Sequence, residues 1–220
     1  MLQVVINSVV YASEIAIIAI GVSLCYSILR FTNFAHIQLA IVGGYLAYTF
    51  ASIPGLPLPV AVLLSAIATG LIAVLVDVIV FSRIRNISPE GKMIVSWGVA
   101  LFIRAIVASI FGGAAIIIET SSTPIRFGGA IFTSLDVIVV VSTIVFMILL
   151  HAFLYRTRAG SALRALASNY DLAVTRGIPG ERMIRLMWFI SGAYAAIGGS
   201  LLALETRLQP NMDLIILLPV

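Results

Sequence analysis

Residues 58–81, LPVAVLLSAIATGLIAVLVDVIVF, decide the fold. A bilayer-spanning helix needs about 20 consecutive apolar residues, and the only formal charge in this stretch is Asp77. Five further runs of this kind lie at 9–29, 33–53, 89–111, 135–155 and 186–204, and a last one begins near Asp213. The sequence therefore predicts an all-α, polytopic transmembrane helix bundle with six spans and the start of a seventh.

The composition agrees with a chain that is solvated by lipid. Hydrophobic residues make up 61% of the 220 positions and charged residues 10%, whereas roughly a quarter of an ordinary soluble domain is charged. The pI is near 9.6, but the basic residues are scattered between apolar runs, so we expect no nucleic-acid partner. Cys25 has no second cysteine to pair with and is expected to be a small core residue.

The distribution of basic residues predicts the orientation. If the six runs cross alternately, ten of the 13 basic residues fall on one side: position 30, positions 83–92 and the loop 156–185. The positive-inside rule places these loops in the cytoplasm, with the amino terminus outside. No Lys or Arg precedes Arg30, so we expect the first run to be retained as a helix and not cleaved as a signal peptide.

Several boundaries carry local signals. Ser88, Pro89 and Glu90 supply a capping oxygen, a preset first turn and a charge that suits the helix dipole. In the outer loop 112–134, glycines surround the apolar runs 116–118 and 125–127, a pattern compatible with a short surface hairpin. Because 214–220 is apolar but too short to cross, we expect one domain over 1–220 that is truncated at its C-terminal end.

The inner loop 156–185 contains an amphipathic pattern. Its apolar positions follow helical spacing, at Leu163, Leu166, Ala167 and Tyr170. The pattern predicts a short helix outside the membrane. Two roles stay open on the pattern alone, a helix lying on the lipid surface and a helix docking into a groove of a partner protein.

Residue identity favours the second role. The segment 158–178 resembles the cytoplasmic coupling loop of ATP-binding cassette (ABC) importer permeases, whose signature is Glu-Ala-Ala with a Gly four residues after the second Ala. Asp171, Leu172, Ala173 and Gly177 match that spacing, with Asp in place of Glu and Leu in place of Ala. The resemblance implies that the residues that couple this chain to the ATPase are Gly160, Leu163, Arg164, Leu166, Asp171, Ala173 and Gly177.

A second resemblance narrows the family. The segment RFTNFAH at 30–36, followed by GGY at 43–45, is similar to motifs of the branched-chain amino acid permeases, a group that also includes urea and short-amide importers. The likeness continues after the coupling loop through 188–210. Ile37 stands where the family usually has Gly, and Gln38 where an acidic residue is common. These two departures put the substrate in question more than the fold.

The resemblance implies a multi-pass subunit of a prokaryotic plasma (inner) membrane. Its expected partners are two cytoplasmic ATP-binding subunits, a second permease subunit and an extracytoplasmic solute-binding protein. The chain has no phosphate-binding Gly-x-x-x-x-Gly-Lys-Ser/Thr loop, so it is expected to hydrolyse no ATP itself. We expect no catalytic residues, no metal and no cofactor.

Polar residues inside the spans are candidates for the translocation path. Asn33, His36 and Gln38 cluster at the start of the second span, although Asn33 is equally a helix cap and His36 equally a structural residue. Arg104 within the fourth span must face a partner, the bundle interior or water, and it suits either solute contact or pairing with an acid. Asp77 is expected near headgroups or paired with Arg83.

Small residues recur at four-residue spacing from Ser191 to Ser200 and permit close helix contact, within the subunit or with a second permease. A stand-alone secondary transporter or channel is the competing function. It would need no docking loop, and it would usually carry several membrane carboxylates. A membrane enzyme is less favoured, because no cluster of catalytic residues stands out.

Overall fold

The computed structural model describes residues 1–220 except 54, 117–122, 128–129, 207, 211 and 213–220. Its elements, in chain order, are α1 (Leu2–Leu29), α2 (Ala35–Ala51), α3 (Leu58–Ile79), the 3₁₀ turn η1 (Phe81–Ile84), α4 (Pro89–Phe111), β1 (Pro124–Phe127), β2 (Ala130–Thr133), α5 (Ser134–Arg156), α6 (Arg158–Ser168), α7 (Tyr170–Thr175) and α8 (Gly180–Glu205). The prediction of an all-α helix bundle is confirmed. The start of a seventh span near Asp213 lies outside the described residues.

Within the described residues, five helices are long and apolar enough to cross a membrane: α1, α3 with η1, α4, α5 and α8. The remaining predicted span is α2, whose 17 residues are at the lower limit of about 17 for a crossing. Most of α2, from Ala35 to Tyr45, is buried among its neighbours. It is therefore an internal helix of the bundle.

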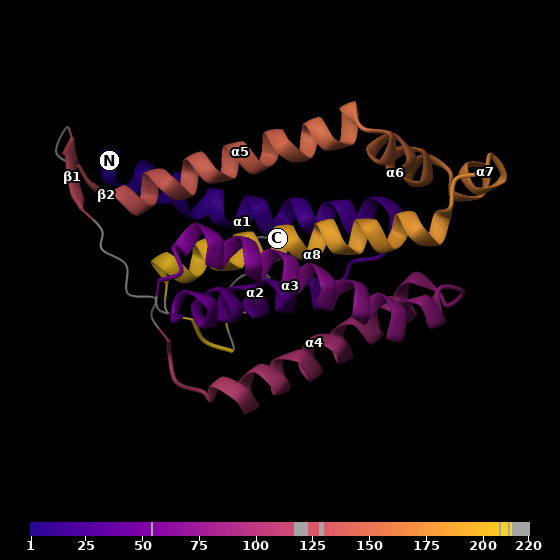
Figure 1. Ribbon diagram of the computed structural model, residues 1–220, viewed down its shortest axis with the longest axis horizontal. Coiled ribbons are helices and arrows are strands. Elements are labelled where there is room, and N and C mark those ends of the chain that lie inside the picture. The colour runs from indigo at the N-terminus through magenta and orange to yellow at the C-terminus, as the bar shows by residue number, and fades with distance from the viewer. Residues whose placement is uncertain (54, 117–122, 128–129, 207, 211, 213–220) are drawn as a thin grey trace.

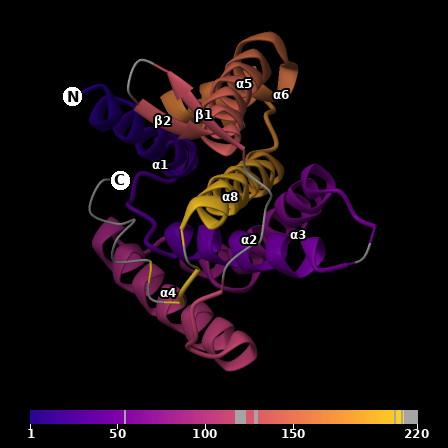
Figure 2. The same cartoon turned by 90° about the vertical axis from the view of Figure 1, so that its left-hand side faces the viewer.

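Helix α8 forms the centre of the bundle. Figure 2 shows it surrounded by α1, α2, α3 and α5, with α4 on the outside against α2. The predicted stripe of small residues makes this arrangement possible. A Cβ added to Gly199 would lie 1.8 Å from the carbonyl oxygen of Ala40, and one added to Gly43 would lie 2.2 Å from the Cα of Ala196. The close contacts of the stripe are therefore made within this chain.

The bundle has two distinct ends, which Figure 1 shows at left and right. At one end β1 and β2 form an antiparallel hairpin, whose Ile131 exchanges two 2.8 Å hydrogen bonds with the side chain of Gln3. The hairpin expected in the outer loop is present. Its strands are not the two apolar runs of that loop, because 125–127 pairs with the strand that follows it. Ile116, from the other apolar run, forms a bridge with Leu208. At the opposite end lie α6 and α7.

The expected start and end of α4 are confirmed. The Ser88 hydroxyl accepts a hydrogen bond from the Gly91 amide at 3.3 Å, and Pro89 occupies the first turn. Cys25 is buried, as expected.

Candidate coupling loop and translocation path

Helix α6 packs on its own bundle. Thr157 caps it by accepting a hydrogen bond from the Gly160 amide at 2.9 Å. Gly160 lies so close to α5 that an added Cβ would be 2.2 Å from the Phe153 carbonyl oxygen. Leu163 and Leu166 are 1% and 2% exposed, because they face the helices of this chain. Within this chain the two leucines thus pack against their own bundle, and their coupling role stays a prediction.

The amphipathic segment consists of two helices and not one. Asn169 breaks it with an extended backbone, and the Asn169 side chain accepts a hydrogen bond from the Leu172 amide at 3.0 Å to start α7. Tyr170 thus belongs to α7 and does not continue the face of α6. An Asn at this position favours a new helix start because its short side chain competes with the backbone hydrogen bonds of a continuous helix.

Gly177 follows the last turn of α7 and ends the helix. Its φ is +88°, its amide donates to the Val174 carbonyl at 2.9 Å, and the Ile178 amide donates to the Ala173 carbonyl at 3.1 Å. These paired hydrogen bonds form a Schellman motif, in which glycine is favoured because L side chains are strained at positive φ. The chain then turns directly into α8.

Helix α7 carries exposed apolar side chains at this end of the bundle. Leu172 is 55% exposed and Val174 41% exposed, whereas Ala173 between them is buried. Asp171, in the first turn of α7, is exposed. Arg164 on α6 is also exposed, and its guanidinium lies over the ring of Tyr155, 4.4 Å from the centroid. Both helices therefore carry buried and exposed signature positions: Gly160, Leu163, Leu166 and Ala173 are buried, whereas Arg164 and Asp171 are exposed.

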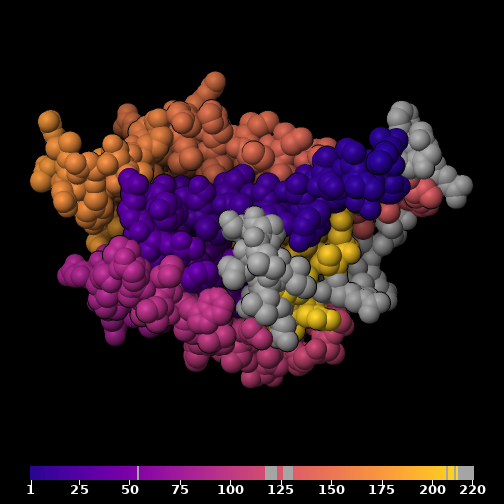
Figure 3. Space-filling view, turned by 180° about the vertical axis from the view of Figure 1, so that it is seen from behind, coloured from indigo at the N-terminus to yellow at the C-terminus, as the bar shows by residue number. Residues whose placement is uncertain are grey.

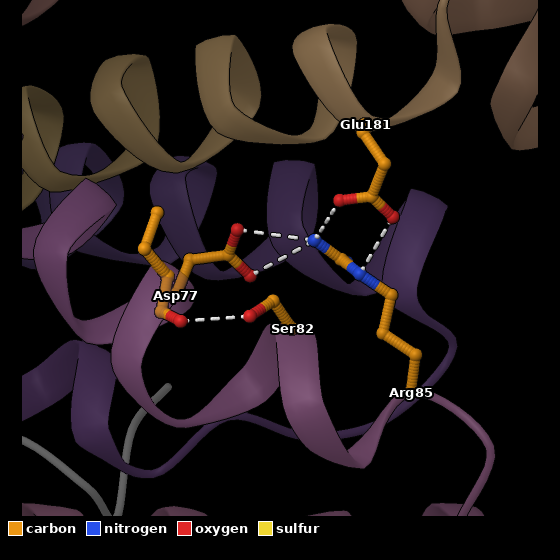
Figure 4. Close-up of polar contacts among 5 residues, drawn as sticks. Asp77, Ser82, Arg85 and Glu181 are labelled. Carbon is orange, nitrogen blue, oxygen red and sulfur yellow. Dashed lines mark hydrogen bonds and ion pairs between the residues drawn. The ribbon is translucent and has the colours of Figure 1, made fainter.

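Two arginines tie this end of the molecule together. Arg30, at the C-terminal cap of α1, donates to the carbonyl of Ala167 on α6. Arg85 follows η1 and contacts two carboxylates (Figure 4): its Nη2 donates to Asp77 at 3.1 Å and to Glu181 at 2.9 Å, and its Nε lies 2.9 Å from the second oxygen of Glu181. We call Asp77, Arg85 and Glu181 the carboxylate clasp.

The clasp corrects the expectation for Asp77. Its side chain is fully buried, and its partner is Arg85, not Arg83 or the headgroup region. Hydropathy places Asp77 near the end of the third span, but the 3₁₀ turn brings the chain back so that Arg85 reaches it. Because Glu181 lies in the first turn of α8, the clasp joins α3 to the helix that follows α7 directly.

His36 lies at a buried polar contact between α1, α2 and α8. Its Nδ1 is 3.0 Å from the Ser191 hydroxyl, which donates to the Gly21 carbonyl at 3.1 Å and lies 3.0 Å from the Cys25 sulfur. Asn33 is also buried, and its side-chain oxygen accepts a hydrogen bond from the Ala35 amide at the start of α2. The local geometry of both residues is that of helix packing and helix capping.

Asn33 and His36 each leave one side-chain nitrogen without a partner among the described residues, whereas Gln38 leaves both of its polar atoms unpartnered. Gln38 is also 0% exposed. An unpartnered buried amide costs about 1 to 3 kcal/mol, so such a group is expected to meet water, a solute or a moving neighbour. The neighbouring Ile37 continues the regular helix and is buried in the core.

Arg104 lies at nearly the same depth as Gln38. Two ring contacts, Phe34 with Trp97 and Tyr45 with Phe111, set a parallel register between α2 and α4. In that register Gln38 of α2 lies at the height of α4 residues that are within about one helical turn of Arg104. Arg104 is half-buried. Of the four path candidates, Gln38 and Arg104 thus share one level of the bundle, whereas His36 contacts α1 and α8.

These features define a multi-pass helical membrane protein with a short helical element outside the spans. The family described as branched-chain amino acid transport system, permease component, matches residues 4–220. A probable branched-chain amino acid transport permease protein LivH of Methanocaldococcus jannaschii is 33% identical over 96% of this chain and 69% of the relative. No solved structure matches the chain.

Two further relatives agree. The high-affinity branched-chain amino acid transport system permease LivH of Salmonella typhimurium is 27% identical over 91% of this chain and 70% of its own length, and BraD of Pseudomonas aeruginosa is 25% identical over 93% and 71%. The chain belongs to the branched-chain amino acid transport system permease family. It is the permease component of an ABC transport system, and such a subunit is a transport component and not an enzyme.

Proposed function

We propose that this chain forms the translocation path of an importer for branched-chain amino acids, and that α7 is its docking element for the ATP-binding subunits. The observation that carries the docking proposal is the exposed pair Leu172 and Val174 on a short helix outside the spans. Burying two such aliphatic side chains in a partner stabilises a contact by about 1.5 to 3 kcal/mol each when burial is complete.

Motion of α7 would reach the spans through two rigid connections. The Schellman turn at Gly177 leads into α8 without a flexible linker, and the clasp joins the start of α8 to α3. Arg30 ties α1 to α6 in the same region. A displacement of α7 by a bound ATPase would therefore act first on α8, which follows α7 directly. Because α8 contacts α1, α2 and α3, the displacement would then reach those helices.

The remaining partners follow from the family. Membership in an ABC system supports a pair of ATP-binding subunits, a second permease subunit and an extracytoplasmic solute-binding protein. The basic loops, with α6 and α7, are proposed to be cytoplasmic in the prokaryotic plasma membrane. One domain spans 1–220, with 156–185 as its coupling loop.

Gln38 is the proposed contact for the solute, with Arg104 near it in depth. A primary amide offers both a donor and an acceptor, which suits the charged amino and carboxylate groups of an amino acid. It suits urea or a short amide equally well, so competition between these solutes is the assay for the substrate. Asn33 and His36 are proposed to support the path by fixing the position of the start of α2.

The test is ATP-dependent uptake into vesicles that contain the permease, its ATP-binding subunits and the solute-binding protein. Labelled leucine is expected to accumulate, with unlabelled isoleucine and valine competing and urea failing to compete. Gln38→Leu is expected to lower uptake at least tenfold, whereas Ile37→Leu, its buried neighbour, changes it little. Competition by urea and not by isoleucine would overturn the assigned substrate, and uptake without ATP would overturn the ABC mechanism.

A further inference from the structure

A groove at the junction of α1, α5 and α6 is not used by the proposed transport path. Its volume is about 350 Å³, within the roughly 300 to 1,000 Å³ of small-molecule sites. Its walls are aliphatic, and the residues that matter here are Ile20 and Leu24 of α1 and Leu150 and Leu154 of α5. The groove is therefore shaped for an apolar chain and not for a zwitterionic solute.

One end of the groove is polar and positively charged. Arg164 of α6 lines this end with Tyr155, whose ring lies beneath the guanidinium. Ala167 also lines the groove, and its carbonyl accepts from Arg30, so a second guanidinium lies close by. Ser27 adds a hydroxyl to the lining, and none of the described residues that line the groove is acidic.

The apolar walls and the cationic end match the two parts of an anionic phospholipid. We propose that this groove binds one such lipid, with an acyl chain along α1 and α5 and the phosphate at Arg164. Basic pockets between transmembrane helices near the cytoplasmic surface bind anionic headgroups in this way. The groove is accessible to lipid because Ser23, Tyr155 and Arg164 in its lining are exposed.

The position of the site gives the lipid a role. Leu163 of α6 forms part of the groove and is also part of the bundle core. A bound lipid would thus fill the space beside α6, the helix that precedes α7 in the chain. Figure 3 shows α1 lying open along much of one face beside α5, with α6 and α7 at the end of both helices. This inference does not depend on the transported solute or on the ATP-binding partner.

The test counts lipid bound to the full chain, purified in neutral detergent, by native mass spectrometry during titration with phosphatidylglycerol or phosphatidylcholine. The native chain is expected to hold one lipid saturably and to prefer phosphatidylglycerol. Arg164→Gln should lower the affinity for phosphatidylglycerol about fivefold, the effect of one arginine beside an anionic headgroup. Arg164→Lys should keep the preference, and so should Arg182→Gln, which removes an exposed charge at the same end outside the groove.

A second pair of variants tests the apolar walls. Ser27→Trp places a large ring in the groove and should abolish the saturable lipid, whereas Ser109→Trp on the exposed side of α4 should not. Equal losses in Arg164→Gln and Arg182→Gln would overturn the headgroup site. Absence of a saturable lipid from the native chain, the result if a second copy or a further segment of protein covers the groove, would overturn the proposal as a whole.

Discussion

Arg85→Gln is the substitution with the largest expected effect in the carboxylate clasp. It leaves Asp77, which is fully buried, without its cation. Removing one partner of a buried ion pair costs about 3 to 5 kcal/mol, because the other charge stays desolvated. For a chain of this size that loss corresponds to a fall in Tm of about 10 °C.

The two carboxylates are expected to differ. Glu181 is 51% exposed, so Glu181→Gln should cost no more than about 1 kcal/mol, as for a surface pair. The double variant Asp77→Asn, Arg85→Gln should recover most of the loss, because the uncompensated charge is gone. The assay is thermal unfolding of the purified chain in detergent, monitored by circular dichroism.

Arg83→Gln is the matched control, since Arg83 is exposed on the neighbouring turn and forms no ion pair within the described residues. It should leave Tm within about 2 °C, the range of ordinary surface substitutions. Equal Tm values for Arg85→Gln and Arg83→Gln would refute the reasoning. A double variant that is less stable than Arg85→Gln alone would refute the assigned cause.

Three further outcomes are expected. Gly199→Ala should destabilise the chain by about 1 to 3 kcal/mol through overpacking against α2. Its control, Gly98→Ala, has open space around it and should be neutral or slightly stabilising in the same unfolding assay. Equal effects of the two substitutions would contradict the tight packing at Gly199. Gly177→Ala should cost about 1 to 2 kcal/mol at its positive φ, and unchanged stability would contradict the Schellman turn. A membrane-impermeant maleimide should label Ile131→Cys in intact cells but Arg176→Cys only after permeabilisation. The native Cys25 is buried and should give little background labelling. The reverse pattern would contradict the proposed orientation.

Much of the bundle could be predicted from hydropathy and helix-start signals. Apolar length alone locates the spans, and Ser88 with Pro89 marks the start of α4 at the observed residue. The sequence also contains a signal for the helix break, because Asn169 is a residue type that favours helix N-caps. It is hidden because the apolar spacing continues across the break to Tyr170.

The contacts of the coupling loop could not be predicted in the same way. Periodicity shows that Leu163 and Leu166 share a face, but not whether that face meets the same chain or a partner. The contact of Arg85 with Asp77 depends on a 3₁₀ turn between them, and the contact with Glu181 joins residues 96 apart in the chain. Neither pair has the helical spacing that would reveal an ion pair.

The most direct test of the docking proposal is copurification of the ATP-binding subunits with the membrane-inserted permease. The double variant Leu172→Asp, Val174→Asp changes only exposed side chains of α7, and its matched control, Ile125→Asp, Ile131→Asp, changes exposed side chains of the hairpin. The account predicts that the α7 variant loses the ATP-binding subunits while the native chain and the hairpin variant keep them. Equal recovery with both variants would contradict the assignment of α7 as the docking element.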